Sequence, residues 1–291
     1  MNKFATAVLL LLLLPCSISR AQDKDKSSSD FFLYSIGNSH TWDFRPAADF
    51  LEIGKTLDIE IKNGWHINCG QNLETIWNNP GQTCVDLTGY GAYNEAIENY
   101  IWDAISIQTF KGGTGIAEKE AVEKFLGFIA GSMNKDCNVF IYCTWPRNTA
   151  TQLGDFDYAE EWHSDFHEND TLKILSEKYF TYVENSIENN ADKVKFIPLG
   201  KVLYHFDKKA RSGEVPGYSG AGELYRDAWH LNNVGRYIAG LTVFSQIFRM
   251  DPVDIPDFES YQISDRWPSD RELTSKQKAV IRKIISEVLN F

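Results

Sequence analysis

The stretch Phe31-Phe32-Leu33-Tyr34-Ser35-Ile36-Gly37-Asn38-Ser39-His40-Thr41 decides how this chain folds. A largely apolar run of this length is typical of a strand buried on both faces, as in a parallel sheet. Gly37 permits a tight backbone turn directly after such a strand. We therefore expect Ser39 at the carboxyl edge of a sheet, in the turn that leads into a helix.

Further apolar runs alternate with helical patterns along the rest of the chain, which indicates right-handed βαβ units. The strands are expected at residues 31–36, 58–62, 104–108, 139–144 and 194–198. The helices are expected at residues 44–57, 93–100, 117–132, 172–189, 232–248 and 274–289. The predicted fold class is α/β, a three-layer α/β/α sandwich with a central, mostly parallel five-stranded sheet. Residues 146–170 show little periodicity and are expected to form a long surface loop near the carboxyl ends of the strands.

The N-terminal residues have the pattern of a secretory signal peptide, with Lys3 before an apolar segment and small residues around Ala21. We expect cleavage near Ala21 and a secreted or periplasmic protein. A lipoprotein anchored through Cys16 is the less favoured alternative, because a proline directly precedes that cysteine. The polar segment that follows is expected to be a flexible leader.

The expected organisation is thus a signal peptide at residues 1–21, a leader at 22–30 and one domain at 31–291. The chain carries a formal net charge of −11 and has no basic tract, so nucleic acid and anionic membranes are poor partners. The apolar N-terminal segment is shorter than the about 20 residues that span a bilayer, so no stable membrane insertion is expected. The sequence does not specify an oligomeric state.

Cysteine usage fits an oxidising compartment. Cys69 and Cys84 can bridge the loop that they bracket. Cys137 and Cys143 flank one expected strand and would lie too far apart for a local disulfide, so we expect them to be buried as small apolar side chains. No spacing of cysteine and histidine resembles a zinc site.

Two short segments far apart in the sequence carry the residues for nucleophilic catalysis. Ser39 supplies a hydroxyl at a strand end, and Asp227-Ala228-Trp229-His230 supplies a carboxylate that can orient an imidazole three residues later. Each segment also has an ordinary structural interpretation. Ser39 can cap the following helix, and Asp227 can be a helix N-cap beside a surface histidine.

The order of these segments resembles the SGNH (GDSL-like) hydrolase superfamily, in a divergent branch with Gly-Asn-Ser in place of Gly-Asp-Ser. The resemblance implies a flavodoxin-like fold in which Ser39 is the nucleophile, His230 the general base and then acid, and Asp227 its orienting carboxylate. It also implies an oxyanion hole formed by the N–H groups of Ser39 and Gly70. No metal or organic cofactor is implied.

The third oxyanion donor of the superfamily is an asparagine after strand three, and this chain departs from that pattern. Gln108 stands at the matching strand end and carries a side-chain amide that can donate the same hydrogen bond. The alternative is a structural glutamine that satisfies the backbone of a loop. After the next strand, Trp145 can stack on a substrate and Arg147 can contact an anionic or hydroxylated one. Ordinary turn residues are the alternative for both.

The function expected from these features is a secreted serine esterase that removes acyl groups, acetyl above all, from a carbohydrate or a similar hydrophilic substrate. The partner is then a small-molecule or glycan ester. The alternative is a catalytically inactive carbohydrate-binding or surface protein on the same fold.

Overall fold

Five strands, all paired in parallel, form the central sheet in the order β2-β1-β3-β4-β5. The computed structural model describes residues 30–44, 46, 48–150, 155–187, 193–258 and 270–291. The strands are β1 Asp30–Gly37, β2 Glu60–Ile67, β3 Ala104–Gln108, β4 Asn138–Tyr142 and β5 Val194–Ile197. In this strand order the chain reverses direction across the sheet between β1 and β3, and ligands of such folds bind at the carboxyl ends of the strands beside that point.

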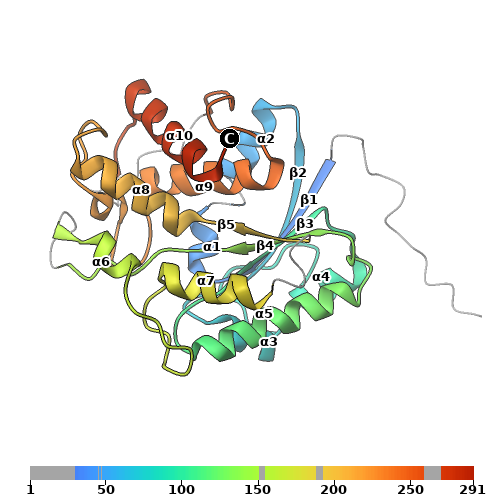
Figure 1. Ribbon diagram of the computed structural model, residues 1–291. Coiled ribbons are helices and arrows are strands. Elements are labelled where there is room, and N and C mark those ends of the chain that lie inside the picture. Colours follow the sequence, from blue (N-terminus) through green and yellow to red (C-terminus); the bar gives the residue numbers. More distant parts are fainter. Residues whose placement is uncertain (1–29, 45, 47, 151–154, 188–192, 259–269) are drawn as a thin grey trace, which may run out of the picture.

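Helices cover both faces of the sheet, as Figure 1 shows. One layer contains α2 Asp49–Thr56, α8 Leu199–Arg211, α9 Asn233–Phe248 and α10 Ser275–Leu289. The other contains α3 Leu73–Asn78, α4 Tyr93–Asn99, α5 Gly115–Ala130 and α7 Glu177–Ser186. Two short helices, α1 Ser39–Asp43 and α6 Tyr158–Trp162, lie at the end of the sheet where the strands finish. The predicted three-layer α/β/α sandwich with a parallel five-stranded sheet is confirmed.

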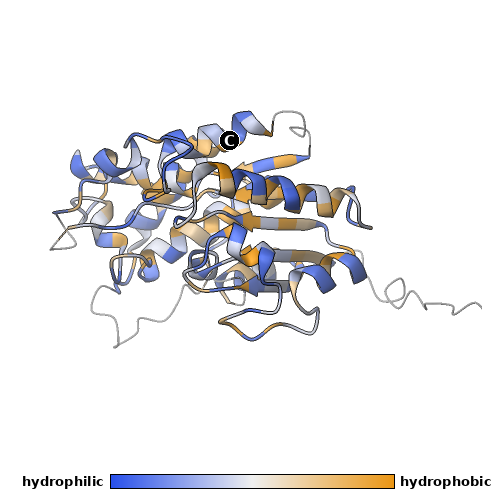
Figure 2. Cartoon of the chain, turned by 90° about the horizontal axis from the view of Figure 1, so that it is seen from below, coloured by the Kyte–Doolittle hydropathy of each residue, from blue (hydrophilic) through white to orange (hydrophobic). Residues whose placement is uncertain are grey.

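The core follows from the apolar runs. All five residues of β3 are buried, because this strand has a neighbour on each side and helices on both faces. The outer helices are banded blue and orange in Figure 2, as expected where one face packs on the sheet and the other meets water. Strands that are buried along their length hold their carboxyl ends rigidly, and the loops that follow them carry the site.

Several element boundaries differ from the predicted ones. The expected helix at 44–57 begins later, as α2 at Asp49–Thr56, and a separate short helix, α1, precedes it at Ser39–Asp43, with Pro46 between the two. The second strand extends to Ile67 instead of ending at residue 62, and two helices, α3 and α8, were not predicted. The expected surface loop at 146–170 contains α6, and its aromatic side chains Phe156, Tyr158 and Trp162 are buried in the core. Apolar packing against α8 therefore orders part of a segment whose sequence lacks periodicity.

Cys69 and Cys84 form a disulfide, with their Cα atoms 5.6 Å apart, and Cys137 and Cys143 are free and buried. Both expectations for the cysteines are confirmed. The predicted signal peptide and nearly all of the predicted leader lie outside the described residues. Within the described part of the chain, no helix is long and apolar enough to cross a membrane.

Candidate active site

The turn after β1 presents Ser39 as the first residue of α1. Asn38 precedes the helix, and its side-chain oxygen accepts a hydrogen bond from the His40 N–H at 2.9 Å, which caps the helix. A Cβ atom at Gly37 would overlap the side chains of Thr41 and Gln108, so only glycine fits at this strand end. The N–H of Ser39 belongs to the first residue of the helix, so no carbonyl of the helix is placed to accept a hydrogen bond from it.

The structure brings Ser39, His230 and Asp227 together. The Nε2 atom of His230 lies 3.0 Å from the Ser39 hydroxyl oxygen. On the other side of the ring, Nδ1 lies 3.0 Å from Oδ1 and 2.9 Å from Oδ2 of Asp227. A carboxylate can only accept, so Nδ1 carries a proton, and in the neutral ring Nε2 is free to accept the hydroxyl proton of Ser39.

Asp227 is held in its ionised form by the loop that carries it. Its Oδ1 atom also accepts the backbone N–H groups of Trp229 at 2.8 Å and of His230 at 2.9 Å. Partial burial acts to raise the pKa of this carboxyl, but the two N–H donors and the His230 ring outweigh burial and lower the pKa below its usual value. The carboxylate is therefore a fixed negative charge that orients the imidazole and stabilises it when it is protonated.

The hydrogen bonds of Gln108 fit the alternative interpretation, a structural glutamine that satisfies the backbone of a loop. It is buried, and its Oε1 atom accepts from the N–H of Asn38 at 3.0 Å and from the N–H and hydroxyl of Thr41 at 3.2 and 2.8 Å. These donors fix the orientation of the amide, because a turned amide would point Nε2 at two N–H groups. Nε2 donates to the carbonyl of Thr109 at 2.9 Å. Gln108 thus holds the turn after β1, which carries Ser39, in place.

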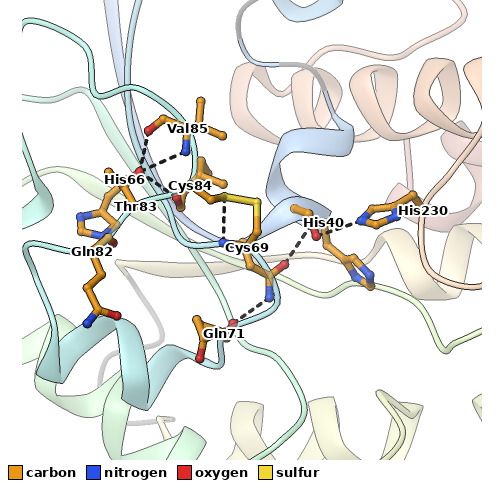
Figure 3. Close-up of a disulfide and its surroundings, with 12 residues drawn as sticks. His40, His66, Cys69, Gln71, Gln82, Thr83, Cys84, Val85 and His230 are labelled. Atoms are coloured by element: carbon orange, nitrogen blue, oxygen red, sulfur yellow. Dashed lines mark hydrogen bonds between the residues drawn. A yellow bond between two sulfur atoms is a disulfide. The ribbon is translucent and has the colours of Figure 1, made fainter.

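Gly70 lies in the loop after β2, and hydrogen bonds on both sides of it join this loop to the turn after β1. The Asn68 N–H donates to the Gly37 carbonyl at 2.9 Å, and the Asn38 side chain donates to the Gln71 carbonyl at 2.8 Å. Gly70 has φ +71°, which favours glycine. Figure 3 shows Gln71 beside the Cys69–Cys84 disulfide, with His40 and His230 to one side. The disulfide closes the same loop.

Asn68 is a polar residue of this loop whose role the sequence did not indicate. Its side chain is buried, and its Nδ2 atom has no hydrogen-bond partner among the described residues. A buried amide without a partner is costly, so it marks a position where a further acceptor is expected. The segment Asn68-Cys69-Gly70 pointed only to the glycine, because nothing in the residue type distinguishes a loop asparagine from a donor.

Trp145 is wholly buried, so it cannot stack on a substrate as expected. Its ring stacks on the His40 ring, with the ring centroids 4.3 Å apart, and its Nε1 atom donates to the Trp229 carbonyl at 2.9 Å. His40 is buried as well, and burial together with the nearby His230 lowers its pKa well below the usual value. Trp145 therefore supports the loop that carries His230.

Arg147 is exposed at the rim, where the sequence predicted it, and its guanidinium carbon lies 4.7 Å from the ring centroid of Trp229. The ammonium of Lys111 lies 3.8 Å from the same ring centroid. Trp229 is only partly buried and directly precedes His230. Trp229 and Lys111 were not predicted as site residues, because the contact depends on how loops far apart in the sequence pack together.

Asp43 and Arg236 were also not predicted, and they join the two halves of the site. Asp43 is fully buried on α1 and pairs with Arg236 on α9, while its other oxygen accepts the Leu231 N–H at 2.9 Å. Within the described residues there is no group of three or more His, Cys, Asp or Glu side chains that could hold a metal ion.

Comparison of the sequence with models of known families and with curated proteins finds no match. Among solved structures, a DUF4886 family protein from Bacteroides uniformis is similar, with a TM-score of 0.61 and 18% identity over 90% of this chain and 95% of that one. A candidate SGNH hydrolase from Slackia heliotrinireducens matches with a TM-score of 0.45 and 17% identity, over 75% of this chain and 99% of that one. A GDSL-like lipase from Bacteroides thetaiotaomicron matches with a TM-score of 0.43 and 14% identity, over 75% and 88%. The chain thus shares the fold of the DUF4886 family protein.

Proposed function

We propose that this protein is a serine esterase, secreted or periplasmic, that hydrolyses acyl esters of a hydrophilic substrate such as an acetylated carbohydrate. The observation that carries the proposal is the hydrogen-bonded chain from the Ser39 hydroxyl through the His230 ring to the Asp227 carboxylate, with distances of 3.0 and 2.9 Å. Nucleophile, base and orienting group in hydrogen-bond reach are the geometry that acyl transfer through a serine requires.

In the first half of the reaction, His230 takes the Ser39 proton on Nε2 while the serine oxygen attacks the ester carbonyl. The N–H groups of Ser39 and Gly70 stabilise the negative oxygen of the tetrahedral intermediate, and the Asn68 amide is our candidate for the third donor. As the intermediate collapses, the protonated His230 gives its proton to the departing alcohol, and the acyl group stays on Ser39.

The second half repeats these steps with water. His230 removes a proton from a water molecule, the hydroxide attacks the acyl carbonyl, and the proton returns to Ser39 as the carboxylic acid leaves. Asp227 remains ionised throughout and stabilises the imidazolium that forms twice in each cycle.

The alternative is a carbohydrate-binding protein that has lost turnover, and its basis is the absence of the superfamily's asparagine after strand three. The hydrogen bond between Ser39 and His230 favours the enzyme. The substrate class rests on the acidic chain, the N-terminal sequence pattern and the polar and aromatic residues at the rim, such as Trp229 and Arg147.

The test is release of p-nitrophenol from p-nitrophenyl acetate by the mature protein, beside the variants Ser39→Ala and His230→Ala. We expect both variants to lose at least about a thousandfold in kcat/KM with circular dichroism unchanged, since members of a triad act as a unit. Equal rates in all three proteins would mean background hydrolysis and would contradict a Ser39 esterase.

A further inference from the structure

We infer that the active site selects anionic esters, in which a negatively charged group near the scissile bond binds the cationic pair Lys111 and Arg147 beside Trp229. This inference rests on the proposed esterase function and specifies its substrate class. The anionic group can belong to the acyl part of the ester or to its leaving alcohol. Both positions are tested below.

The cationic pair and the Trp229 ring come from three loops at the carboxyl edge of the sheet. Lys111 follows β3, Arg147 follows β4, and Trp229 belongs to the loop that carries Asp227 and His230. Both cations contact the Trp229 ring. The Lys111 ammonium lies 3.8 Å from the ring centroid, and the Arg147 guanidinium carbon lies 4.7 Å from it. Two positive charges therefore lie against the side chain of Trp229, which directly precedes the proposed base, His230.

The backbone fixes the position of the ring relative to the proposed triad. The Trp229 N–H donates to Asp227 at 2.8 Å, and the Trp229 carbonyl accepts from the buried Trp145 indole at 2.9 Å. The centroid of the Trp229 ring lies 6.4 Å from that of Phe110, and the Phe110 centroid lies 4.9 Å from that of His40, the residue after Ser39. An anionic group held here belongs to the same substrate whose ester lies at Ser39.

Among the described residues, the contacts of these two cations are with the Trp229 ring, and neither has a carboxylate within ion-pair distance. Two cations gathered on one ring also repel each other, and partial burial together with the Arg147 charge lowers the pKa of Lys111. Contact with an indole offsets only part of this repulsion. A negatively charged ligand group supplies the missing counter-charge.

The experiment compares matched esters that differ in one charge. The pair 4-acetoxybenzoate and its methyl ester places the charge on the leaving group, and the pair mono-p-nitrophenyl glutarate and p-nitrophenyl butyrate places it on the acyl group. For each protein the readout is the ratio of kcat/KM for the charged ester to that for the neutral one. Comparing this ratio between wild type and variants cancels the intrinsic reactivity of the esters.

We expect the ratio to fall at least tenfold in Lys111→Met/Arg147→Met for one of the two pairs, and to fall less in each single variant. The charge control is Lys276→Met, which removes an exposed cation from α10 and should leave the ratio at its wild-type value. Raising the salt concentration should lower the ratio of the wild type toward that of the double variant.

The outcomes separate the two proposals. Ser39-dependent hydrolysis with the same ratio in wild type and double variant would overturn the selection of anionic esters and leave the esterase in place. Absence of Ser39-dependent hydrolysis of all four esters would overturn the esterase, and the substrate class with it. An equal fall of the ratio in the Lys276 control would assign the effect to total charge and also overturn the inference.

Discussion

Asp43 and Arg236 are 193 residues apart in the sequence and form a buried two-point ion pair in which Arg236 Nε and Nη2 lie 2.9 and 2.6 Å from the same carboxylate oxygen. Asp43 ends the helix that begins with Ser39, and its other oxygen accepts the N–H of Leu231, the residue after His230. One buried carboxylate therefore sets the distance between the proposed nucleophile and the proposed base.

Substitution of Arg236 tests this relationship. Arg236→Met keeps the aliphatic part of the side chain but leaves the Asp43 carboxylate buried without its main partner, and breaking a buried pair in this way costs about 3–5 kcal/mol. We expect the free energy of unfolding in urea to fall by that amount and the esterase activity to fall with it. In the control Lys55→Met, loss of the exposed pair with Glu52 should change stability by no more than about 0.5 kcal/mol. A change below about 1 kcal/mol in Arg236→Met would show that the pair does not join the two halves.

Glu118 gives the protein a pH-dependent stability that its buried position explains. Its carboxylate accepts the N–H groups of Phe110, Leu73 and Glu74, but burial outweighs these donors and raises its pKa to about 7. Between its usual pKa and about 7, the folded protein therefore binds more protons at this site than the unfolded chain. The stability associated with the protonated acid is complete below the unfolded pKa and is lost as the pH rises through about 7.

The measurement is the difference in unfolding free energy between wild type and Glu118→Gln from pH 4 to pH 8. The amide cannot ionise, so only the wild type should lose this stability. Its free energy of unfolding should fall by roughly 3 kcal/mol relative to that of Glu118→Gln as the pH rises, which is the equivalent of the pKa shift. The exposed Glu120→Gln on the same helix serves as the control and should show no comparable trend. A flat difference for Glu118→Gln would mean that its pKa is not raised in the folded protein.

The sequence predicts the parts of this site that depend on local pattern. The apolar run before Gly37 places Ser39 at a strand end, and three-residue spacing allows Asp227 to reach the His230 ring. The roles of Gln108 and Trp145 could not be predicted in this way. A glutamine amide can donate to a ligand or accept from a turn, and an indole can stack on a sugar or on a buried histidine. Which role applies depends on how loops from separate strands pack.

Gln108 and Asn68 should respond to substitution in opposite ways. Gln108→Leu leaves the N–H groups of Asn38 and Thr41 without their acceptor, and each buried unsatisfied group costs about 1–3 kcal/mol. We expect a loss of stability of roughly 2–5 kcal/mol in urea unfolding. If Gln108→Leu instead folds as stably as wild type and loses only kcat, the glutamine is an oxyanion donor and not a support of the turn.

Asn68→Ala should leave stability nearly unchanged or raise it, because the Nδ2 atom that it removes has no partner among the described residues. The proposed role as third oxyanion donor predicts a fall in kcat of about 10²- to 10³-fold with little change in KM. The control is Asn94→Ala, which removes a side-chain oxygen that likewise lacks a partner in the described structure, but from α4. Equal kcat in Asn68→Ala and wild type would exclude the amide from the oxyanion hole.

His40 is the residue most easily mistaken for a catalytic group, because it adjoins Ser39 and its ring centroid lies 6.1 Å from that of His230. Its ring is buried against Trp145 and Phe110, and neither ring nitrogen has a hydrogen-bond partner among the described residues. Burial lowers its pKa well below the usual value, so the ring is neutral near neutral pH. His40→Phe keeps the aromatic contacts and removes two unsatisfied buried nitrogens. We expect the free energy of unfolding to rise by about 1 kcal/mol and the pH–rate profile to stay that of wild type. His230→Ala, measured beside it, should abolish activity, whereas a folded His40→Phe protein with the same loss would make His40 a participant in proton transfer.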